Sequence, residues 1–275
     1  MQKRTISILG CGWLGLPLAI SLQKEGYIVK GSTTSPEKIK ILEDNGIEPH
    51  SLTISDTAIE ASNLSRFLDS EIVIVNFPPK RRADIFDFHT AQMRLLINAL
   101  QNSRVTKVIF ASSTSIYPET NTVVTEQENG IPSKDNGKAL LAVEQMFLDQ
   151  TAFQTTVIRF SGLIGYDRMP GRFLAGKKNI ENGDAPINVI HQDDCISISK
   201  TIIEKEIWGE IFNASTDEHP KRKDYYTLAA EKIGLEKPTF AEQETTSYKI
   251  IDSSKLKEQL EYTFLHPDPL ALLND

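Results

Sequence analysis

The chain has 275 residues, of which 40% are hydrophobic and 24% are charged, a composition typical of globular proteins with a sizeable core. Its 30 basic and 37 acidic residues give a net charge of -7 at pH 7, which disfavours nucleic acid or an anionic membrane as the main partner. Neither a run of about 18 apolar residues nor a signal-peptide pattern occurs, so we expect a cytoplasmic protein with no membrane partner.

A glycine-rich segment follows the first predicted strand, Ile6–Leu9, and precedes a predicted helix at Leu14–Glu25. Gly10 allows a tight turn, Gly12 allows close approach to a pyrophosphate, and Gly15 allows the helix to pack on the strand. The unpaired N–H groups and the dipole at the helix start attract phosphate. A purely structural glycine turn is the alternative. The predicted cofactor contacts in this loop are Gly10, Gly12, Trp13, Leu14 and Gly15.

Strand and helix patterns alternate along the first part of the chain, which predicts an α/β fold with a parallel sheet covered by helices. The predicted strands are Ile6–Leu9, Tyr27–Ser32, Ile72–Phe77, Val105–Ser112 and Thr155–Ser161. The predicted helices are Leu14–Glu25, Pro36–Glu43, Asp84–Gln101 and Lys138–Thr151.

The end of the second predicted strand bears on the choice of cofactor. An NAD enzyme typically has Asp or Glu there to hold the ribose hydroxyls, whereas this chain reads Gly-Ser-Thr-Thr-Ser at residues 31–35. The hydroxyls of Thr33 and Thr34, together with Lys38, can instead donate to a 2′-phosphate. We therefore predict NADP as the cofactor, with NAD as the alternative. The alternative for Lys38 is that it is simply a solvated helix residue.

The alternation weakens after Gly162, where loops rich in Gly, Pro and Asp continue to His191, and such loops usually carry specificity. The elements predicted beyond are a strand at Ile187–Ile190, a helix at Asp194–Glu204, a strand at Glu210–Asn213 and a helix at Arg222–Ile233. We expect a dinucleotide-binding domain at residues 1–165 that also receives 187–213. Residues 166–186 and 214–275 are expected to form a small substrate-binding lobe.

Four segments in a shared order carry a resemblance to a known family. They are the glycine loop, Ser112-Ser113-Thr114-Ser115-Ile116-Tyr117, Arg159-Phe160-Ser161-Gly162, and Ile190-His191-Gln192-Asp193-Asp194. With them the chain resembles the extended short-chain dehydrogenase/reductases, in particular the atypical subgroup of the NAD-dependent epimerase/dehydratase family. This resemblance implies a doubly wound Rossmann-type sheet that binds NAD or NADP, and a C-terminal lobe that closes over a small-molecule substrate, often a nucleotide-linked sugar. It also implies a homodimer through the predicted helices Asp84–Gln101 and Lys138–Thr151.

The resemblance fails at the usual catalytic pair of the family, a Tyr-x-x-x-Lys whose tyrosine moves a proton and whose lysine lowers the tyrosine pKa. In relatives the lysine lies four residues before the glutamate that Glu144 matches, and the tyrosine four residues earlier. Here those places hold Leu140 and Asn136, and an amide does not titrate.

The catalytic candidates are therefore Ser113, Tyr117 and Lys138. Ser113 matches the family's Ser/Thr that bonds the reacting oxygen, with turn capping as its alternative role. Tyr117 is the nearest phenol, although its counterpart in relatives is generally structural. Lys138 can swing towards the ribose or the active centre, although its register places it on a different helix face from Leu140.

The remaining site predictions concern the cofactor wall, the substrate and metals. By resemblance, Phe77 and Pro78 form a wall beside the cofactor. Guanidinium groups bind phosphate bidentately, so Arg168 and Arg172 are the predicted substrate contacts. The run Lys80-Arg81-Arg82 is either a solvated loop or another phosphate contact.

No metal site is expected from the sequence. His191 beside Asp193 and Asp194 lacks a second histidine at workable spacing, so His191 and Asp193 are expected to be structural hydrogen-bonding residues. The two cysteines, Cys11 and Cys195, are too few and too unpatterned for a metal site or a disulfide framework.

These observations lead to two functional hypotheses. The first is an NADP-dependent oxidoreductase or epimerase/dehydratase-like enzyme for a sugar or nucleotide-sugar-like substrate, with an unusual proton donor. The second is a catalytically silent NADP(H)-binding sensor or regulatory protein, which the missing Tyr/Lys pair favours.

Overall fold

A computed structural model describes residues 4–79, 82–242 and 246–274. The chain divides into two compact units, each assembled from separate stretches of sequence. Unit 1 comprises residues 1–116, 132–158 and 199–211, and unit 2 comprises residues 117–131, 159–198 and 212–275. The residues predicted for the substrate lobe, 166–186 and 214–275, all belong to unit 2, which also contains further stretches. The substrate-binding role of this unit stays a prediction.

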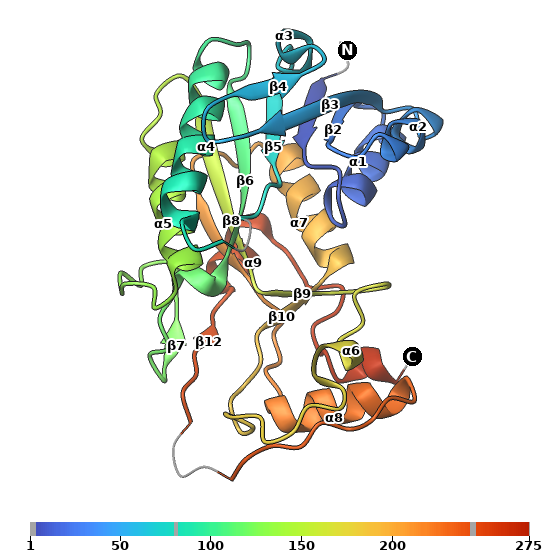
Figure 1. Ribbon diagram of the computed structural model, residues 1–275, viewed down its shortest axis with the longest axis vertical. Coiled ribbons are helices and arrows are strands. Elements are labelled where there is room, and N and C mark those ends of the chain that lie inside the picture. The colour runs from blue at the N-terminus through green and yellow to red at the C-terminus, as the bar shows by residue number, and fades with distance from the viewer. Residues whose placement is uncertain (1–3, 80–81, 243–245, 275) are drawn as a thin grey trace. The chain divides into compact units, whose positions relative to one another are not determined.

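The central feature of the fold is an eight-stranded sheet with the order β11-β8-β6-β5-β1-β2-β3-β4 (Figure 1). Its strands are β1 (Thr5–Leu9), β2 (Ile28–Thr33), β3 (Glu48–Ile54), β4 (Ile59–Ala61), β5 (Ile72–Val75), β6 (Lys107–Ser113), β8 (Gln154–Phe160) and β11 (Ile211–Ala214). The boundary between the two units falls within β8 and β11. The predicted α/β class with a mostly parallel, Rossmann-like sheet is confirmed.

The first strand occupies the point where the chain reverses its direction of travel across the sheet. β1 pairs in parallel with β2 on one side and with β5 on the other, so that Ile8 lies opposite both Gly31 and Ile74. Ile6, Ile8 and Leu9 are buried, as expected for a strand covered on both faces. Ligands of open α/β sheets bind outside the carboxyl ends of strands at such a switch point.

Helices cover both faces of the sheet in unit 1. They are α1 (Gly15–Lys24), α2 (Glu37–Asp44), α3 (Leu64–Phe67), α4 (Ile85–Gln101) and α5 (Asp135–Leu148), with a short 3-10 turn, η1, at Thr114–Ile116. In Figure 1, α4 and α5 lie side by side on one face, whereas α1 and α2 lie on the other. In α1, Leu18 and Leu22 are buried against the sheet, consistent with their helical spacing.

Unit 2 contains shorter elements. These are β7 (Val123–Val124), β9 (Gly162–Ile164), α6 (Gly171–Leu174), β10 (Val189–His191), α8 (Arg222–Lys232), β12 (Ile250–Ile251), α9 (Ser254–Leu260) and a 3-10 turn, η2 (Ala271–Leu273). Parallel pairs β9–β10 and β7–β12 link distant parts of its sequence. A core around Ile164, Val189 and Tyr225 packs against Phe173 and Tyr226. Helix α7 (Gln192–Lys205) begins in this unit and ends in unit 1.

Some element boundaries differ from the predictions. Helix α5 begins at Asp135, three residues before the predicted start, and ends at Leu148 instead of Thr151. Strand β5 ends at Val75, which leaves Phe77 in the following loop. The strand β3 was missed, although its burial alternates residue by residue at His50, Leu52 and Ile54, a period-2 signal present in the sequence.

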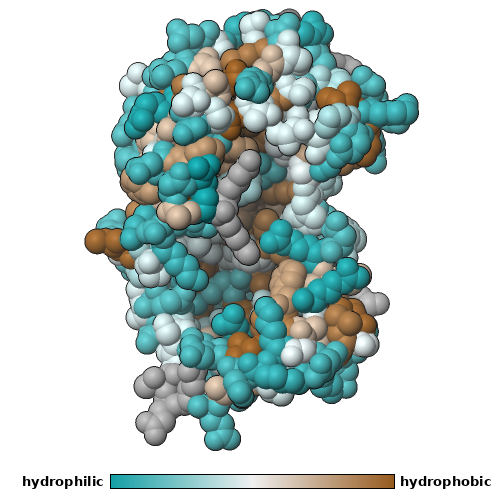
Figure 2. Space-filling model, in the orientation of Figure 1, coloured by the Kyte–Doolittle hydropathy of each residue, from teal (hydrophilic) through white to brown (hydrophobic). Residues whose placement is uncertain are grey.

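On the face drawn in Figure 2 hydrophilic residues predominate, and hydrophobic residues form separate patches. The exposed large hydrophobic side chains include Ile131, Tyr166 and Leu265. Among the helices in the described part of the chain, none combines the length and apolar character that a bilayer crossing requires.

Candidate functional site

The three glycines of the loop after β1 meet different surroundings. A Cβ on Gly10 would lie 2.4 Å from the Asn76 carbonyl oxygen, and Gly10 has a φ of +97°, which disfavours other residues. A Cβ on Gly15 would lie 2.2 Å from the Gly10 carbonyl oxygen. A Cβ on Gly12 would meet nothing within 4 Å. Gly10 and Gly15 are thus required by the packing of the loop itself, whereas Gly12 borders open space.

Hydrogen bonds from two neighbouring strands hold this loop in place. The Gly10 N–H donates to the Ser32 hydroxyl at 2.9 Å, and the Cys11 N–H donates to the Ser32 carbonyl at 2.8 Å. From the other side, the Asn76 amide donates to the Gly10 carbonyl at 3.1 Å. Asn76 was not among the predicted site residues, although its place directly after β5, at the switch point, was a usable signal.

Helix α1 begins directly behind the loop and has no side-chain cap at its N-terminus. The first N–H groups of a helix lack intrahelical partners and carry the positive end of the dipole, so they favour an anion. Leu14 is buried and Trp13 is half-buried at this helix start. The open side of Gly12 beside an uncapped helix start fits the diphosphate of a dinucleotide.

The end of β2 supplies hydroxyls and a cation. Thr33 is buried and its hydroxyl accepts the Ser35 N–H at 3.0 Å, while Thr34 is exposed. Burial raises the pKa of the Cys11 thiol to about 12, and the positive charge of Lys38 acts on this thiol in the opposite direction. Lys38 follows the end of β2 and its backbone N–H donates to the Ser35 carbonyl at 3.0 Å, while the buried Cys11 is a neutral space-filling residue.

The loop after β5 forms the predicted cofactor wall. Phe77 is half-buried and stacks on the buried His89 of α4, with ring centroids 6.2 Å apart, while Pro78 is exposed. Burial lowers the pKa of His89, which keeps this ring neutral and apolar in character. In the basic run, Lys80 and Arg81 lie outside the described residues. Arg82 is exposed and pairs with Asp84, Nη2 to Oδ2, at 2.7 Å.

The two serines at the end of β6 have different partners. Ser112 is buried, and its hydroxyl donates to the carboxylate of Glu144, a buried residue of α5. Ser113 is half-buried, and its hydroxyl accepts the Ser115 N–H at 3.1 Å, which is the turn role considered as its alternative. A hydroxyl that accepts one bond still has its proton to donate. The predicted role of Ser113 therefore stays compatible with its turn bond.

Helix α5 presents no phenol beside this turn. Gly137 packs so tightly that a Cβ would lie 2.5 Å from the Ser115 carbonyl oxygen. Asn136 precedes it, and Leu140 is buried. Lys138 pairs with Asp135 at 3.0 Å in the first turn of the helix, and its side chain is 43% exposed.

The remaining predicted residues belong to unit 2. Tyr117 is buried; its hydroxyl donates to Asn213 at 2.7 Å and accepts from Arg159 at 2.6 Å, which favours the structural role. Arg168 and Arg172 are both exposed and lie on one short segment, Arg168 opposite Gly165 in an isolated bridge and Arg172 in α6. They remain predicted substrate contacts.

Comparison with known proteins adds to this geometry. A model of the NAD dependent epimerase/dehydratase family matches residues 6–214. Protein YeeZ of Escherichia coli K12 is 29% identical over 271 residues, which are 98% of each chain.

Two solved structures have similar folds. A short-chain dehydrogenase/reductase superfamily protein from Agrobacterium tumefaciens with bound NAD has a TM-score of 0.79 and 19% identity, covering 98% of this chain and 95% of that chain. UDP-glucuronic acid 4-epimerase from Bacillus cereus, in complex with UDP-glucuronic acid and NAD, has a TM-score of 0.78 and 19% identity, covering 98% of this chain and 96% of that chain. These structures support the fold assignment.

Proposed function

Since this chain belongs to the NAD dependent epimerase/dehydratase family, we propose that it binds a nicotinamide dinucleotide in unit 1 and acts as an oxidoreductase or epimerase/dehydratase-like enzyme. The observation that carries this proposal is the loop after β1, where Gly10 and Gly15 are locked by backbone contacts and Gly12 borders open space. Such a loop allows a diphosphate to contact backbone N–H groups without an intervening side chain.

The proposed cofactor is NADP, with NAD as the alternative. Residues 31–35 contain no carboxylate to accept ribose hydroxyls, whereas Thr34 is exposed and the Lys38 N–H bonds the Ser35 carbonyl at the end of β2. A 2′-phosphate needs donors and positive charge, which these residues provide. The Agrobacterium and Bacillus proteins contain NAD, so the direct comparison of the two cofactors is informative.

The proposed substrate is a sugar or nucleotide-sugar-like molecule. UDP-glucuronic acid is bound by the Bacillus epimerase of similar fold. In this chain, Arg168 and Arg172 would supply the positive charge that an acidic protein needs to hold an anionic substrate.

The cofactor and the residues of this chain would have different roles in the reaction. When bound, the nicotinamide ring supplies the hydride chemistry. Ser113 would donate its proton to the reacting oxygen of the substrate. Of the two candidates for the proton donor, Lys138 and Tyr117, Lys138 would turn towards the substrate at the lower energetic cost. Its exposed ion pair with Asp135 is worth at most about 1 kcal/mol. Redirecting Tyr117 would break two bonds in a buried site.

A second candidate function is a catalytically silent NADP(H)-binding sensor. The observation that favours it is the pair Asn136 and Leu140 at the places where relatives carry the tyrosine and the lysine. Neither side chain titrates, and Leu140 is buried. Cofactor binding is common to both candidates, so the two differ only in turnover.

Fluorescence titration of the purified chain with NADPH and NADH tests the cofactor proposal. We expect saturable NADPH binding that Gly12→Asp abolishes, because a carboxylate would face the diphosphate in the open space beside the loop. Gly12→Ala is the matched control and should remain folded, since a Cβ there meets nothing within 4 Å. Binding of neither nucleotide, or equal binding by Gly12→Asp, would contradict the proposal.

Turnover then separates enzyme from sensor. The chain, saturated with cofactor, is incubated with nucleotide sugars while the absorbance of the nicotinamide ring and the sugar products are followed. Product formation that Ser113→Ala lowers by about 100-fold would support the enzyme. Unchanged sugars with intact NADPH binding would support the sensor.

Three further predictions accompany this proposal. The main partner is a small molecule, the chain is expected in the cytoplasm, and a homodimer is expected through α4 and α5. Light scattering during size-exclusion chromatography tests the dimer directly.

A further inference from the structure

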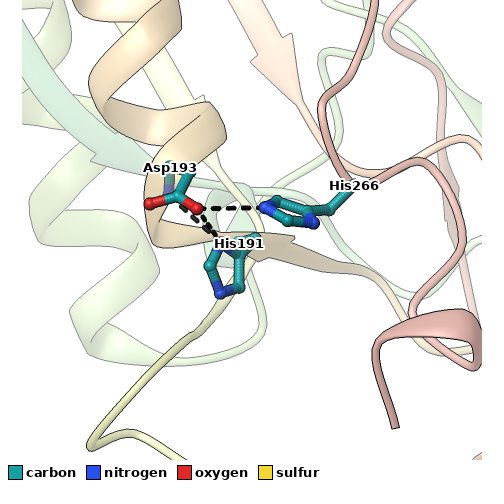
Figure 3. A group of neighbouring side chains, drawn as sticks. All are labelled: His191, Asp193 and His266. Atoms are coloured by element: carbon teal, nitrogen blue, oxygen red, sulfur yellow. Dashed lines mark hydrogen bonds and ion pairs between the residues drawn. The ribbon is translucent and has the colours of Figure 1, made fainter. Parts of the chain in front are cut away.

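Three side chains that can bind metals converge in unit 2, and none of them is among the predicted cofactor-binding residues. His191 ends β10, Asp193 lies in the first turn of α7, and His266 comes from the loop after α9 (Figure 3). Asp193 Oδ2 lies 3.3 Å from His191 Nδ1 and 3.0 Å from His266 Nε2. One ligand atom from each residue lies within 4.8 Å of the other two.

The donor set of this cluster selects a class of ion. Two imidazole nitrogens and one carboxylate suit first-row transition metals such as zinc, whereas Mg²⁺ and Ca²⁺ prefer oxygen ligands only. Bonds of about 2.0–2.2 Å in a tetrahedral zinc site separate ligand atoms by about 3.3 Å, close to the two distances from Asp193. We infer that His191, Asp193 and His266 bind a divalent transition-metal ion, with Zn²⁺ as the reference ion.

His191 Nδ1 faces both the backbone and the carboxylate of Asp193. The Asp193 backbone N–H donates to His191 Nδ1 at 3.2 Å, and this bond uses the one lone pair of that nitrogen, so a metal ion bound at Nδ1 would replace it. The same nitrogen lies 3.3 Å from the carboxylate oxygen Oδ2, and a proton or a metal ion between these two electron-pair donors would remove the repulsion between them.

The buried carboxylate of Asp194 fixes the loop that carries His266. Asp194 is fully buried and accepts three hydrogen bonds, from the Tyr262 hydroxyl at 2.8 Å, the Leu265 N–H at 2.7 Å and the His266 N–H at 3.2 Å. The adjacent residue, Asp193, is thereby held opposite the His266 ring. Supporting bonds of this kind orient metal ligands in proteins.

One side of the cluster remains accessible to water. The Tyr166 hydroxyl donates to the Asp193 carboxylate at 3.0 Å, and Tyr166 is 65% exposed. The side chains of Asp193 and His266 are 31% and 27% exposed. Three protein ligands and an accessible fourth position are typical of zinc sites that bind water or an anion rather than of closed structural sites.

Isothermal titration of the tag-free, metal-depleted full chain with Zn²⁺ tests this site, with Mg²⁺ as the comparison ion. We expect one Zn²⁺ per chain and about 100-fold weaker binding in Asp193→Asn and in His266→Gln. Asp217→Asn, which removes the same charge from an exposed residue of unit 2, should bind like the wild type.

A spectroscopic measurement distinguishes loss of metal binding from misfolding of a variant. Co²⁺ should give the visible absorption of a four-coordinate site in the wild type and in Asp217→Asn, and lose it in His266→Gln with an unchanged circular dichroism spectrum. Equal Zn²⁺ binding by wild type and both cluster variants, or Mg²⁺ binding as tight as Zn²⁺, would overturn the inference. All residues involved lie in unit 2, so this outcome is separate from NADPH binding in unit 1.

Discussion

The glycine loop of unit 1 and the His191–Asp193–His266 cluster of unit 2 are built in opposite ways. The loop occupies six consecutive positions, from Gly10 to Gly15, and its main constraints are backbone contacts. The cluster combines a strand end, a helix start and a loop more than 70 residues further along the chain. A binding site made of backbone depends on local geometry, whereas a site made of side chains depends on whatever the fold brings together.

This difference predicts different responses to substitution. In the loop, replacing a glycine should have an effect because the added Cβ would occupy space that the backbone or the cofactor requires. In the cluster, replacing the buried supporting residue Asp194 should lower stability because it removes several hydrogen bonds at once. The following four predictions test residues of unit 1 and unit 2, from the largest expected effect to the smallest.

The largest effect is expected for Asp194→Ala in unit 2. Three donors, including the backbone N–H groups of Leu265 and His266, would lose a buried charged acceptor. We expect the free energy of unfolding to fall by about 4 kcal/mol, measured by urea denaturation. Tyr262→Phe removes one of the three donors and should cost about 1 kcal/mol. Equal losses for the two variants would mean that Asp194 does not anchor this loop.

Gly15→Ala should destabilise unit 1 by about 3 kcal/mol, because its Cβ would lie 2.2 Å from the Gly10 carbonyl oxygen, which belongs to the backbone and cannot move freely. Gly12→Ala is the control, with an expected change within about 0.5 kcal/mol. Thermal denaturation of the two variants side by side measures the difference. If both were equally stable, the loop would be more adaptable than its contacts indicate.

Lys38→Ala should weaken NADPH binding about tenfold, equivalent to about 1.4 kcal/mol, by removing a positive charge near the proposed 2′-phosphate. NADH affinity should change by less than about twofold, since NADH lacks that phosphate. Lys40→Ala, on the same helix and paired with Asp44 at the surface, is the matched control. A parallel loss for NADPH and NADH would assign Lys38 a general role instead of a selective one.

Acid should destabilise both units through buried histidines. Burial is the main cause that lowers the pKa of His50 and His89 in unit 1 and of His191 and His219 in unit 2. The unfolded chain therefore takes up protons first as the pH falls below the ordinary histidine pKa of 6.5. Stability from these groups is complete above that pH and is lost as the pH falls through the lower pKa values of the folded state.

Urea denaturation at several pH values between about 7 and 5 measures this loss. His89→Leu should reduce the pH dependence, because its ring is fully buried and has one nitrogen without a partner among the described residues. Saturating Zn²⁺ should increase the dependence if the cluster binds metal, since protons compete for its imidazoles. Stability that rises on acidification would contradict the assignment of neutral buried rings.

Much of unit 1 was predictable because its signals are local. The apolar run before Gly10, the helical leucines behind Gly15 and the polar end of β2 each lie within a few residues of the feature they determine. Strand β3, which lies outside the predicted elements, also has a local period-2 pattern of buried residues. Gly137, in the first turn of α5, packs tightly against the backbone at Ser115, and this contact joins residues 22 positions apart, beyond the reach of local propensity.

Unit 2 was less predictable for a physical reason. Its core joins Ile164, Val189 and Tyr225, and its strand pairs join segments far apart in the chain. Nothing next to His266 in the sequence identifies it as a partner of Asp193. The expectation of no metal site depended on the absence of a second histidine close to His191 in the sequence. In the tertiary structure, His266 lies beside Asp193 although it is distant in the sequence.

The sequence by itself determined the family, the α/β sheet and the position of the glycine loop, because glycine spacing and alternating patterns act over a few residues. The tertiary structure decided which polar groups meet: Asn76 with the glycine loop, Glu144 with Ser112, and His266 with Asp193. Backbone conformation is set by neighbours in the chain, whereas a side-chain constellation requires the long-range packing that folding alone provides.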